Sequence, residues 1–211
     1  FADRTDVGKK LAFRLNTVVD ENSVVLAIPR GGVVIGLQIA KHYGIPLDVI
    51  VSKKITPPEN DEYGIGSVLY DGTTHLLDSS LEYFTHEEMQ KEIAQKKEEV
   101  KRRLELYRGN SNYDYLSGKN VILTDDGIAT GSTVFAIADW LKTKKITRAT
   151  LAVPIISSGM FEILSQKFKH VFAMVTPVTF ASISEFYKNF NQTSDDEVIS
   201  ILETYRKHHS I

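Results

Sequence analysis

The chain has 211 residues, of which 42% are hydrophobic and 25% charged, and its formal net charge is −2. This length suits one large domain, or one domain with a smaller cap, and a chain of this size buries about 70% of the surface that it exposes when unfolded. The near-neutral charge argues against a general nucleic-acid binder, and the absence of cysteine excludes disulfides and thiolate metal sites.

The apolar segments are too short for a membrane span. The longest, Val24 to Ala40, is interrupted by Pro29, Arg30 and Gln38, and it falls short of the ~18 uninterrupted apolar residues that a span needs. The first ten residues are charged and lack the apolar centre of a signal peptide. We therefore expect a soluble cytoplasmic protein that does not enter membranes.

Helix and strand patterns alternate in the first part of the chain. An amphipathic helix is predicted over 3–15, and the continuous apolar run at 24–28 indicates a strand covered on both faces. A helix that starts near Gly31 is stopped by Gly44, and 47–51 is the next strand.

The middle of the chain is more polar. The segment 56–66 is rich in proline and acidic residues and is predicted to be a loop. The segment 67–77 resembles a hairpin with Asp-Gly at its turn. Thr85 and Glu88 form a capping box, which predicts a helix that runs to about Tyr107.

Strand and helix patterns alternate again in the second half. Strands are predicted at 121–125, 148–153 and 171–175, and helices at 131–144 and 158–168. Such alternation implies a parallel sheet with right-handed crossovers. The predicted fold class is α/β, with a doubly wound parallel sheet.

The stretch "VILTDDGIATGSTVF" carries the chemistry that the sequence shows most clearly. Asp125 and Asp126 fall at the carboxyl end of a predicted strand, where open parallel sheets bind ligands. Small and hydroxyl-bearing residues lead from them into a helix: Gly127, Ile128, Ala129, Thr130, Gly131, Ser132 and Thr133. The exposed N–H groups and positive end of a helix start bind anions. We expect a phosphate in the loop and a polyhydroxyl group on the carboxylates, as in a phosphorylated sugar.

Simpler explanations exist for each half of this stretch. A turn rich in glycine and threonine is often only a tight connection, and aspartate commonly caps helices. Capping leaves the second aspartate unexplained, so the two halves together favour a ligand site. A P-loop is excluded because no lysine follows Gly131, as the Walker A pattern requires.

A second candidate loop, "AIPRGG", ends the first predicted strand. Gly31 and Gly32 allow a close approach of backbone, and Arg30 offers a rigid fork of donors for phosphate oxygens. The glycine spacing is not that of a dinucleotide fingerprint. The alternative is a surface arginine at a strand end.

Lys53 and Lys54 close the strand predicted at 47–51, and the loop that follows is long enough to act as a lid. They are candidates for bringing positive charge to a bound anion. The alternative is a pair of solvated lysines beside an acidic loop.

These segments resemble the type I phosphoribosyltransferases, whose signature for phosphoribosyl pyrophosphate (PRPP) is an apolar strand, two acidic residues and a Thr/Gly-rich loop. The likeness covers nearly the whole chain. Within the family, the chain resembles the branch described as predicted phosphoribosyltransferases, which has no defined acceptor as a class. Its matching segments are "FADRTDVGKKLAFRL", "AIPRGGV", "PLDVIVSKKI", "ILTDDGIATG", "LAVPI" and "EFYKNFNQTSDDEV".

The resemblance implies a role for each candidate residue. Asp125 and Asp126 would bind the ribose 2′- and 3′-hydroxyls, and the loop from Gly127 to Thr133 would wrap the 5-phosphate. The segment 30–32 would form the pyrophosphate loop, with Lys54, and Lys53 beside it, supplying charge from the lid. This branch tends to have Arg-Lys in place of the two lysines, and a lid less acidic than 59–62.

The resemblance also implies the organisation of the chain. One domain would span 1–211, with a core at about 17–175, a lid loop at about 55–67 and a hood at about 176–211 that includes residues 1–16. Phe180 of the hood is the candidate for stacking on an acceptor. The histidines at 208 and 209 are expected to be a solvated tail.

The implied activity is transfer of the 5-phosphoribosyl group from PRPP to a nucleobase or a related nitrogen heterocycle, with release of pyrophosphate. Mg²⁺ would arrive with PRPP near Asp125 and Asp126, because the sequence shows no all-protein metal cage. The alternative is a non-catalytic protein that senses PRPP or a nucleotide, or that binds RNA through the basic stretch at 96–103. Solvated charge on a long helix explains that stretch more simply. Homodimers are common in the family.

Overall fold

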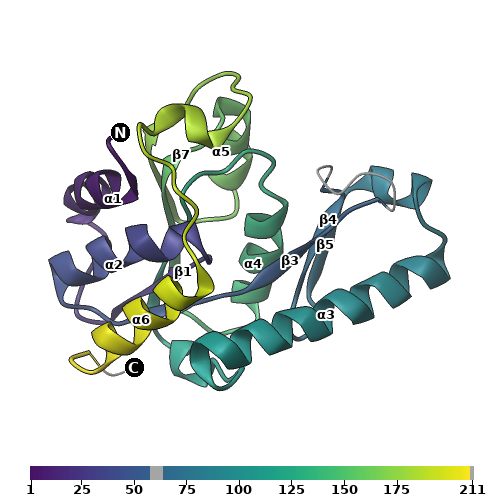
Figure 1. The fold of residues 1–211 in the computed structure, drawn as a ribbon, viewed down its shortest axis with the longest axis horizontal. Helices are drawn as coiled ribbons and strands as arrows, with labels where there is room; N and C mark the ends of the chain where they lie inside the picture. The colour runs from purple at the N-terminus through teal and green to yellow at the C-terminus, as the bar shows by residue number, and fades with distance from the viewer. Residues whose placement is uncertain (58–63, 210–211) are drawn as a thin grey trace. The chain divides into compact units, whose positions relative to one another are not determined.

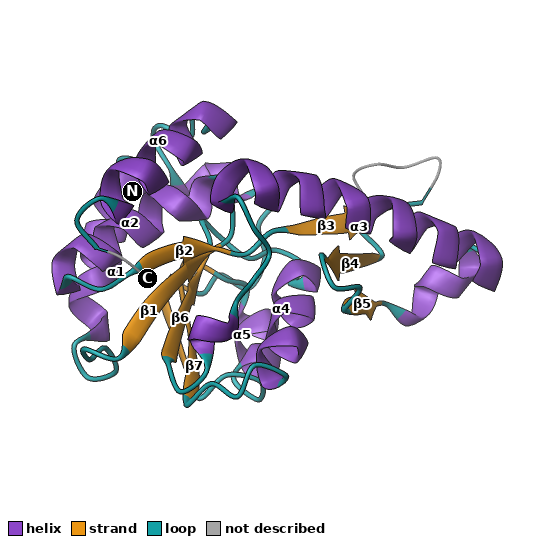
Figure 2. Ribbon diagram, turned by 90° about the horizontal axis from the view of Figure 1, so that it is seen from below, coloured by secondary structure: helices purple, strands orange, loops and turns teal. Residues whose placement is uncertain are grey.

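Two fully buried strands, β1 (Ser23–Ala27) and β6 (Asn120–Thr124), form the centre of a five-stranded sheet. The computed structural model describes residues 1–57 and 64–209. In the sheet, β2 (Leu47–Val49) lies beside β1, and β7 (Arg148–Ile155) and β8 (His170–Val175) continue from β6. All the pairings are parallel, and Figure 2 shows the neighbouring arrows running in one direction. The apolar runs of β1, β2 and β6 explain their burial on both faces, whereas β8 is half-buried along its length.

The order β2-β1-β6-β7-β8 confirms the predicted α/β fold class. From β1 the chain moves outward to β2 on one side, and from β6 it moves to β7 and β8 on the other. The order therefore reverses between β1 and β6, where open α/β sheets bind their ligands.

Helices flank this sheet (Figure 1). α1 (Arg4–Ala12) packs on α2 (Gly31–Tyr43), and α2 contacts β1, β6 and α6 (Asp195–Arg206). α2 ends at Gly44, whose φ of 65° is the left-handed conformation that glycine adopts without strain. α5 (Ser158–Leu164) connects β7 to β8.

Several 3-10 turns complete the described chain. They are η1 (Phe13–Leu15), η2 (Asp78–Glu82), η3 (Asp114–Leu116) and η4 (Ile183–Phe186). Across residues 1–57 and 64–209, no helix combines the length and the apolarity that crossing a membrane requires.

The chain divides into two compact units, each described by itself. The first comprises Phe1–Ile50, Tyr113–Ala129 and Lys144–Ile211, and it contains the five-stranded sheet. The second comprises Val51–Asn112 and Thr130–Thr143.

The second unit is built on a three-stranded antiparallel sheet. Its strands are β3 (Ser52–Ile55), β4 (Gly66–Leu69) and β5 (Thr74–Leu76). Two helices, α3 (His86–Arg108) and α4 (Ser132–Lys142), contact this sheet. Apolar side chains of its strands and of α3 form a small buried core: Ile55, Ile65, Val68 and Met89.

Two local predictions in this unit are confirmed. β4 and β5 pair as the expected antiparallel hairpin. At the start of α3, the Thr85 hydroxyl accepts from the Glu88 N–H, and the Glu88 carboxylate accepts from the Thr85 N–H. These reciprocal bonds satisfy donors that a helix start otherwise leaves without partners.

Two other predictions were wrong. The strand expected at 47–51 ends at Val49, and Lys53 and Lys54 lie on the separate strand β3. The sequence did not show this break, because the buried Ile50 and Val51 continue the apolar run of β2. No helix was predicted at 195–206, where α6 lies. Its start carries a capping box formed by Ser194 and Glu197, a local signal of the same kind as the one at α3.

Candidate active site

The loop after β1 leads directly into the N-terminus of α2. The peptide between Pro29 and Arg30 is cis, and α2 begins at Gly31. The first N–H groups of an α-helix have no acceptor inside the helix, and its N-terminus carries about half a positive charge. Arg30 is half-buried, and its Nη1 lies 3.8 Å from Oδ1 of Asp195. This loop therefore offers backbone donors and a guanidinium to an anion.

The two loops at the switch point lie in contact. A Cβ built on Gly32 would lie 2.9 Å from both the Cα of Asp125 and the carbonyl oxygen of Thr124. A Cβ on Gly31 would overlap Oδ2 of Asp126 and would lie 2.6 Å from Nε of Arg4. Real Cβ atoms do not approach other atoms so closely, so any side chain at Gly32 would have to move backbone, and any side chain at Gly31 would have to move the Asp126 carboxylate or Arg4. The glycines bring the Arg30 loop and the two carboxylates together.

Asp126 is paired with Arg4 of α1. Oδ2 of Asp126 accepts from Nε of Arg4 at 2.9 Å and lies 2.8 Å from Nη2. Nη1 of Arg4 donates to the carbonyl oxygen of Asn191 at 2.7 Å, and the guanidinium carbon lies 3.9 Å from the centroid of the Phe190 ring. Each of the three guanidinium nitrogens therefore has a partner.

The C-terminal segment holds the backbone at the carboxylates. The Tyr187 hydroxyl donates to the carbonyl oxygen of Asp126 at 2.8 Å. Burial raises the pKa of the Tyr187 phenol, which keeps its proton available for this bond. Ile183 packs on Gly127 so closely that a Cβ there would lie 2.7 Å from Cγ2 of Ile183.

The carboxylate of Asp126 is largely removed from solvent, with its side chain 17% exposed. Burial raises the pKa of Asp126, and the guanidinium of Arg4 opposes that rise. Nε and Nη2 of Arg4 both contact Oδ2 of Asp126, so Oδ1 is the oxygen left to a ligand. Oδ1 of Asp125 accepts from the N–H of Asp126 at 2.8 Å.

The rest of the loop in the first unit is anchored to the end of β7. The Ile128 N–H donates to the carbonyl oxygen of Ile155 at 2.8 Å, and Ile128 forms a parallel bridge with Ile156. Ala129, the last residue of this segment, is exposed. The bridge fixes where the loop leaves the sheet.

The second unit carries the other half of the predicted phosphate loop. Gly131 adopts φ 74° before α4, and Ser132 opens that helix. The hydroxyl of Ser132 is buried and has no hydrogen-bond partner among the residues that the structure describes. A Cβ on Gly64 would lie 3.5 Å from Cδ of Lys54 and 3.9 Å from Oγ of Ser132, so both side chains border one point.

The two candidate lysines of β3 have different surroundings. Nζ of Lys53 pairs with a carboxylate oxygen of Glu99 on α3 at 2.8 Å. Successive strand residues point to opposite faces, so Lys54 faces away from that pair. Within this unit, the lysine beside the start of α4 is Lys54.

The basic stretch on α3 is partly neutralised along its own helix. Nζ of Lys96 lies 3.4 Å from Glu92 and 3.7 Å from Glu99, and Nζ of Lys101 lies 2.7 Å from Glu98. Ion pairs three or four residues apart are typical of a solvated helix face.

The sequence matches a family model described as the phosphoribosyl transferase domain over residues 4–159. The chain belongs to that family. The matched segment includes β1, β6 and both loops at the switch point.

Relatives and a solved structure agree with this assignment. Two Mycobacterium tuberculosis proteins, from strains CDC 1551 and H37Rv, are each 34% identical to this chain over 205 residues, 96% of its length; they are named "Putative phosphoribosyl transferase MT0597" and "Putative phosphoribosyl transferase Rv0571c". The chain spans 46% of the length of each of these relatives. The crystal structure of TT1426 from Thermus thermophilus has a TM-score of 0.81 and 32% identity, and the match covers 97% of this chain and 98% of that one.

In this phosphoribosyl transferase domain, the first unit brings the predicted 30–32 loop against Asp125 and Asp126. The second unit brings Lys54 near Ser132. Of the predicted lid at 55–67, residues 58–63 lie outside the described residues.

The ring of Phe180, the candidate acceptor residue, is half-buried. It packs edge-on against Phe186, with centroids 5.4 Å apart. Its role toward an acceptor stays a prediction.

Arg4 was not among the predicted site residues. The only local signal was a charged residue at the start of an amphipathic helix, because its partner Asp126 is 122 positions away. Tyr187 lies in the hood segment predicted at about 176–211. It is buried, but its hydroxyl also reaches the site backbone.

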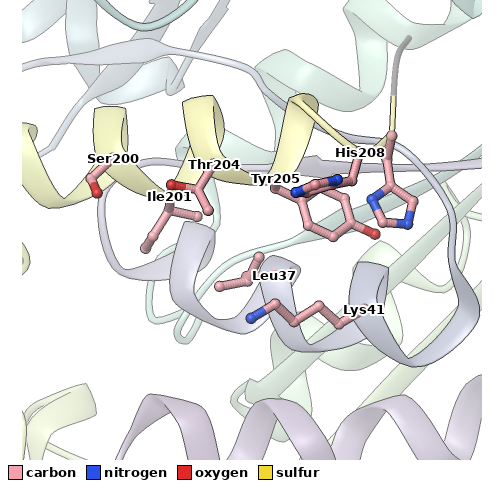
Figure 3. A pocket seen from close by; sticks show the side chains of 8 residues that line it. Leu37, Lys41, Ser200, Ile201, Thr204, Tyr205 and His208 are labelled. Carbon is pink, nitrogen blue, oxygen red and sulfur yellow. The ribbon is translucent and has the colours of Figure 1, made fainter.

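A separate cavity of about 360 Å³ lies in the first unit, between α2 and the C-terminal helix (Figure 3). Leu37 and Lys41 of α2 face Ile201 and Tyr205 across it. The ring of His209 stacks on Tyr205 with centroids 4.3 Å apart, so this histidine is not the solvated tail that we expected. No predicted site residue lines this cavity.

Across the described residues, no group of three or more His, Cys, Asp or Glu side chains is arranged to hold a metal ion. The donors at the switch point are the two adjacent carboxylates, and one of them is already engaged by Arg4. This donor set suits an ion that arrives with most of its oxygen ligands on a phosphorylated substrate.

Substituting Gly31→Ala tests the contact between the two loops. We expect the free energy of unfolding to fall by about 1–3 kcal/mol, because the added methyl group must displace the Asp126 carboxylate or the backbone. Urea unfolding followed by circular dichroism measures this loss.

Gly159→Ala is the matched control, because a Cβ there meets no atom within 4 Å. This change should leave stability equal or slightly higher, since alanine favours helix over glycine. Equal stability of the two variants would contradict the close packing at Gly31.

Proposed function

We propose that the protein transfers the 5-phosphoribosyl group of PRPP to a ring nitrogen of a nucleobase or a related heterocycle and releases pyrophosphate. The observation that carries this proposal is the contact of the Arg30–Gly32 loop with Asp125 and Asp126 at the switch point of the sheet. One side offers donors for a pyrophosphate, and the other offers acceptors for sugar hydroxyls. PRPP carries both groups on adjacent carbons.

The first unit has the groups that this donor requires. Oδ1 of Asp126 and the carboxylate of Asp125 would accept from the ribose hydroxyls. Arg30 and the first N–H groups of α2 would bind the pyrophosphate oxygens, as helix N-termini bind phosphate.

The second unit has features suited to an anion. Its helix α4 has its N-terminal end at Ser132, whose hydroxyl lacks a hydrogen-bond partner among the described residues. The side chain of Lys54 borders the same point beside Gly64 as the Ser132 hydroxyl. We propose that this end of α4 takes the 5-phosphate, through the part of the predicted phosphate loop that lies in the second unit, Thr130 to Thr133. Lys54 is then the better candidate for a ligand-facing charge, because Lys53 is engaged by Glu99.

The reaction needs positioning and charge stabilisation, with no covalent protein intermediate. The bond from the anomeric carbon to the pyrophosphate oxygen breaks, and positive charge develops on the ribose ring, as in glycoside cleavage. The acceptor nitrogen then donates its electron pair to the opposite face of the anomeric carbon, and the acceptor ring loses one N–H proton to water. Arg30 and the helix N-terminus would stabilise the negative charge of the leaving pyrophosphate. The carboxylates would fix the ribose between donor and acceptor.

Mg²⁺ is the metal that this donor implies. When bound, it would neutralise charge on the pyrophosphate and so ease departure of that group. Asp125 and Asp126 are the residues nearest to its expected position, through the ribose oxygens that they would hold.

PRPP with Mg²⁺ should raise the melting temperature, because a ligand that binds only the folded state stabilises it. The double variant Asp125→Asn, Asp126→Asn should lose this shift, since the amides cannot replace two charged acceptors. Differential scanning fluorimetry measures both. The exposed Asp78→Asn variant is the control and should keep the full shift. A full shift in the double variant would refute the assignment of the donor site.

An acceptor panel tests turnover. With Mg²⁺ and PRPP, pyrophosphate release should rise above background with at least one of adenine, guanine, hypoxanthine, xanthine, uracil or orotate. A coupled pyrophosphate assay reports the release, and the Asp125→Asn, Asp126→Asn variant supplies the blank. No release across the panel, with PRPP binding intact, would contradict transfer to these bases and favour a PRPP sensor.

A further inference from the structure

We propose that Arg4 is the positioning residue for the ribose-binding carboxylate: it holds Asp126 by Oδ2 and so presents Oδ1 to a sugar hydroxyl. This inference rests on the proposed function, because it assigns Asp126 to the ribose. It adds a residue from the first helix to the loops after β1 and β6, which are the parts of the proposed site that lie in the first unit.

The geometry of the pair fixes the direction of the carboxylate. Two nitrogens of Arg4, Nε and Nη2, lie 2.9 and 2.8 Å from the same oxygen, Oδ2. The guanidinium is itself held by the carbonyl oxygen of Asn191 and by the face of the Phe190 ring. A planar fork with all its parts engaged cannot rotate without losing several contacts. Oδ1 therefore has one defined direction.

The pair is unlike an ordinary surface ion pair. The side chains of Arg4 and Asp126 are only 10% and 17% exposed. Solvent-exposed ion pairs contribute little to folding stability. Removing one partner of a buried ion pair is strongly destabilising, because it leaves an uncompensated charge in the interior. Arg4 is thus required for a charged Asp126 to be tolerated at this depth.

The same contact governs protonation. A carboxyl group accepts hydrogen bonds from two hydroxyls or metal-bound groups best when it is ionised. Burial raises the pKa of Asp126, and Arg4 is the group that opposes this rise. Without Arg4 the pKa would rise further, so the carboxylate form would be lost at a higher pH.

The other charged and titratable groups around Asp126 do not replace Arg4. Asp125, from the same loop, adds negative charge, and Tyr187, from the C-terminal segment, donates to the backbone carbonyl of Asp126. Arg30, on the loop that Gly31 brings close, is directed to Asp195 at 3.8 Å. Arg4 is therefore the cation that contacts the Asp126 side chain among the described residues.

The test compares Arg4→Gln with Arg14→Gln, an exposed arginine in the turn that follows the same helix. Affinity for Mg-PRPP is measured by isothermal titration calorimetry from pH 5.5 to 8.5. The carboxyl resonance of Asp126 is titrated without ligand by ¹³C NMR, and its loss in Asp126→Asn identifies it. Circular dichroism checks the fold of each variant.

We expect Arg4→Gln to weaken Mg-PRPP binding at pH 7.5 by about tenfold or more, the size of one charge-assisted hydrogen bond. Its binding should also fail at a higher pH than that of the wild type, and the Asp126 resonance should titrate at a higher pH. Arg14→Gln should match the wild type in all three measurements.

Arg4→Lys extends the test in case Arg4→Gln does not fold. A lysine keeps the charge but not the fork, so the affinity of Arg4→Lys for Mg-PRPP should be lower than that of the wild type. Wild-type affinity in Arg4→Lys would overturn the requirement for a fixed direction.

The inference is overturned if Arg4→Gln binds Mg-PRPP as the wild type does. It is also overturned if binding weakens equally at every pH while the Asp126 titration is unchanged, because that pattern marks a merely structural role. Failure of the wild type to bind Mg-PRPP would refute the proposed function and this role together. That outcome is distinct, because it appears before any variant is compared.

Discussion

The structure around the candidate site depends on one buried charge, the carboxylate of Asp126. An isolated carboxylate at that depth would be protonated or would destabilise the fold. Arg4 compensates the charge. Its guanidinium also contacts the Phe190 ring and the carbonyl oxygen of Asn191, and these contacts link the C-terminal segment to the site. The first helix, the end of β6 and the segment after β8 are therefore tied to one side chain. This explains why elements at both ends of the first unit converge on the switch point.

The contact between the loops after β1 and β6 depends on two glycines. Because β1 and β6 are neighbours and parallel, their carboxyl ends deliver two loops to the same place. Side chains at Gly31 and Gly32 would keep these loops apart. Their absence lets the start of α2 lie against two carboxylates. We propose that the helix start takes a pyrophosphate and that the carboxylates take the hydroxyls beside it. The membership of the phosphoribosyl transferase domain family supports the same ligand class.

Local patterns in the sequence were sufficient for much of this arrangement. The apolar runs predicted the strands of the parallel sheet, and "DDGIATGST" and "PRGG" marked the two candidate loops, of which the first unit brings residues 125 and 126 against the glycines at 31 and 32. These strands and loops are determined by residues that are close in sequence, so local patterns were enough to predict them. The start of α6 could also have been predicted, because Ser194 and Glu197 form a capping box.

The rest depends on distant residues. Arg4 and Asp126 are 122 positions apart, and no period or motif links them. The end of β2 at Val49 was hidden because apolar residues continue past it into β3, and only the pairing of Ser52–Ile55 with β4 separates the two strands. The distinction between Lys53 and Lys54 likewise required the position of Glu99 on α3.

The most direct test of this account compares the affinities of ribose 5-phosphate and 2-deoxyribose 5-phosphate by isothermal titration calorimetry. The two ligands share the phosphate and differ by one hydroxyl. If Asp125 and Asp126 hold the ribose hydroxyls, the deoxy sugar should bind at least about tenfold more weakly, because a hydrogen bond to a charged acceptor is lost and the acceptor stays desolvated. Equal affinities would contradict the assignment of the carboxylates to the sugar.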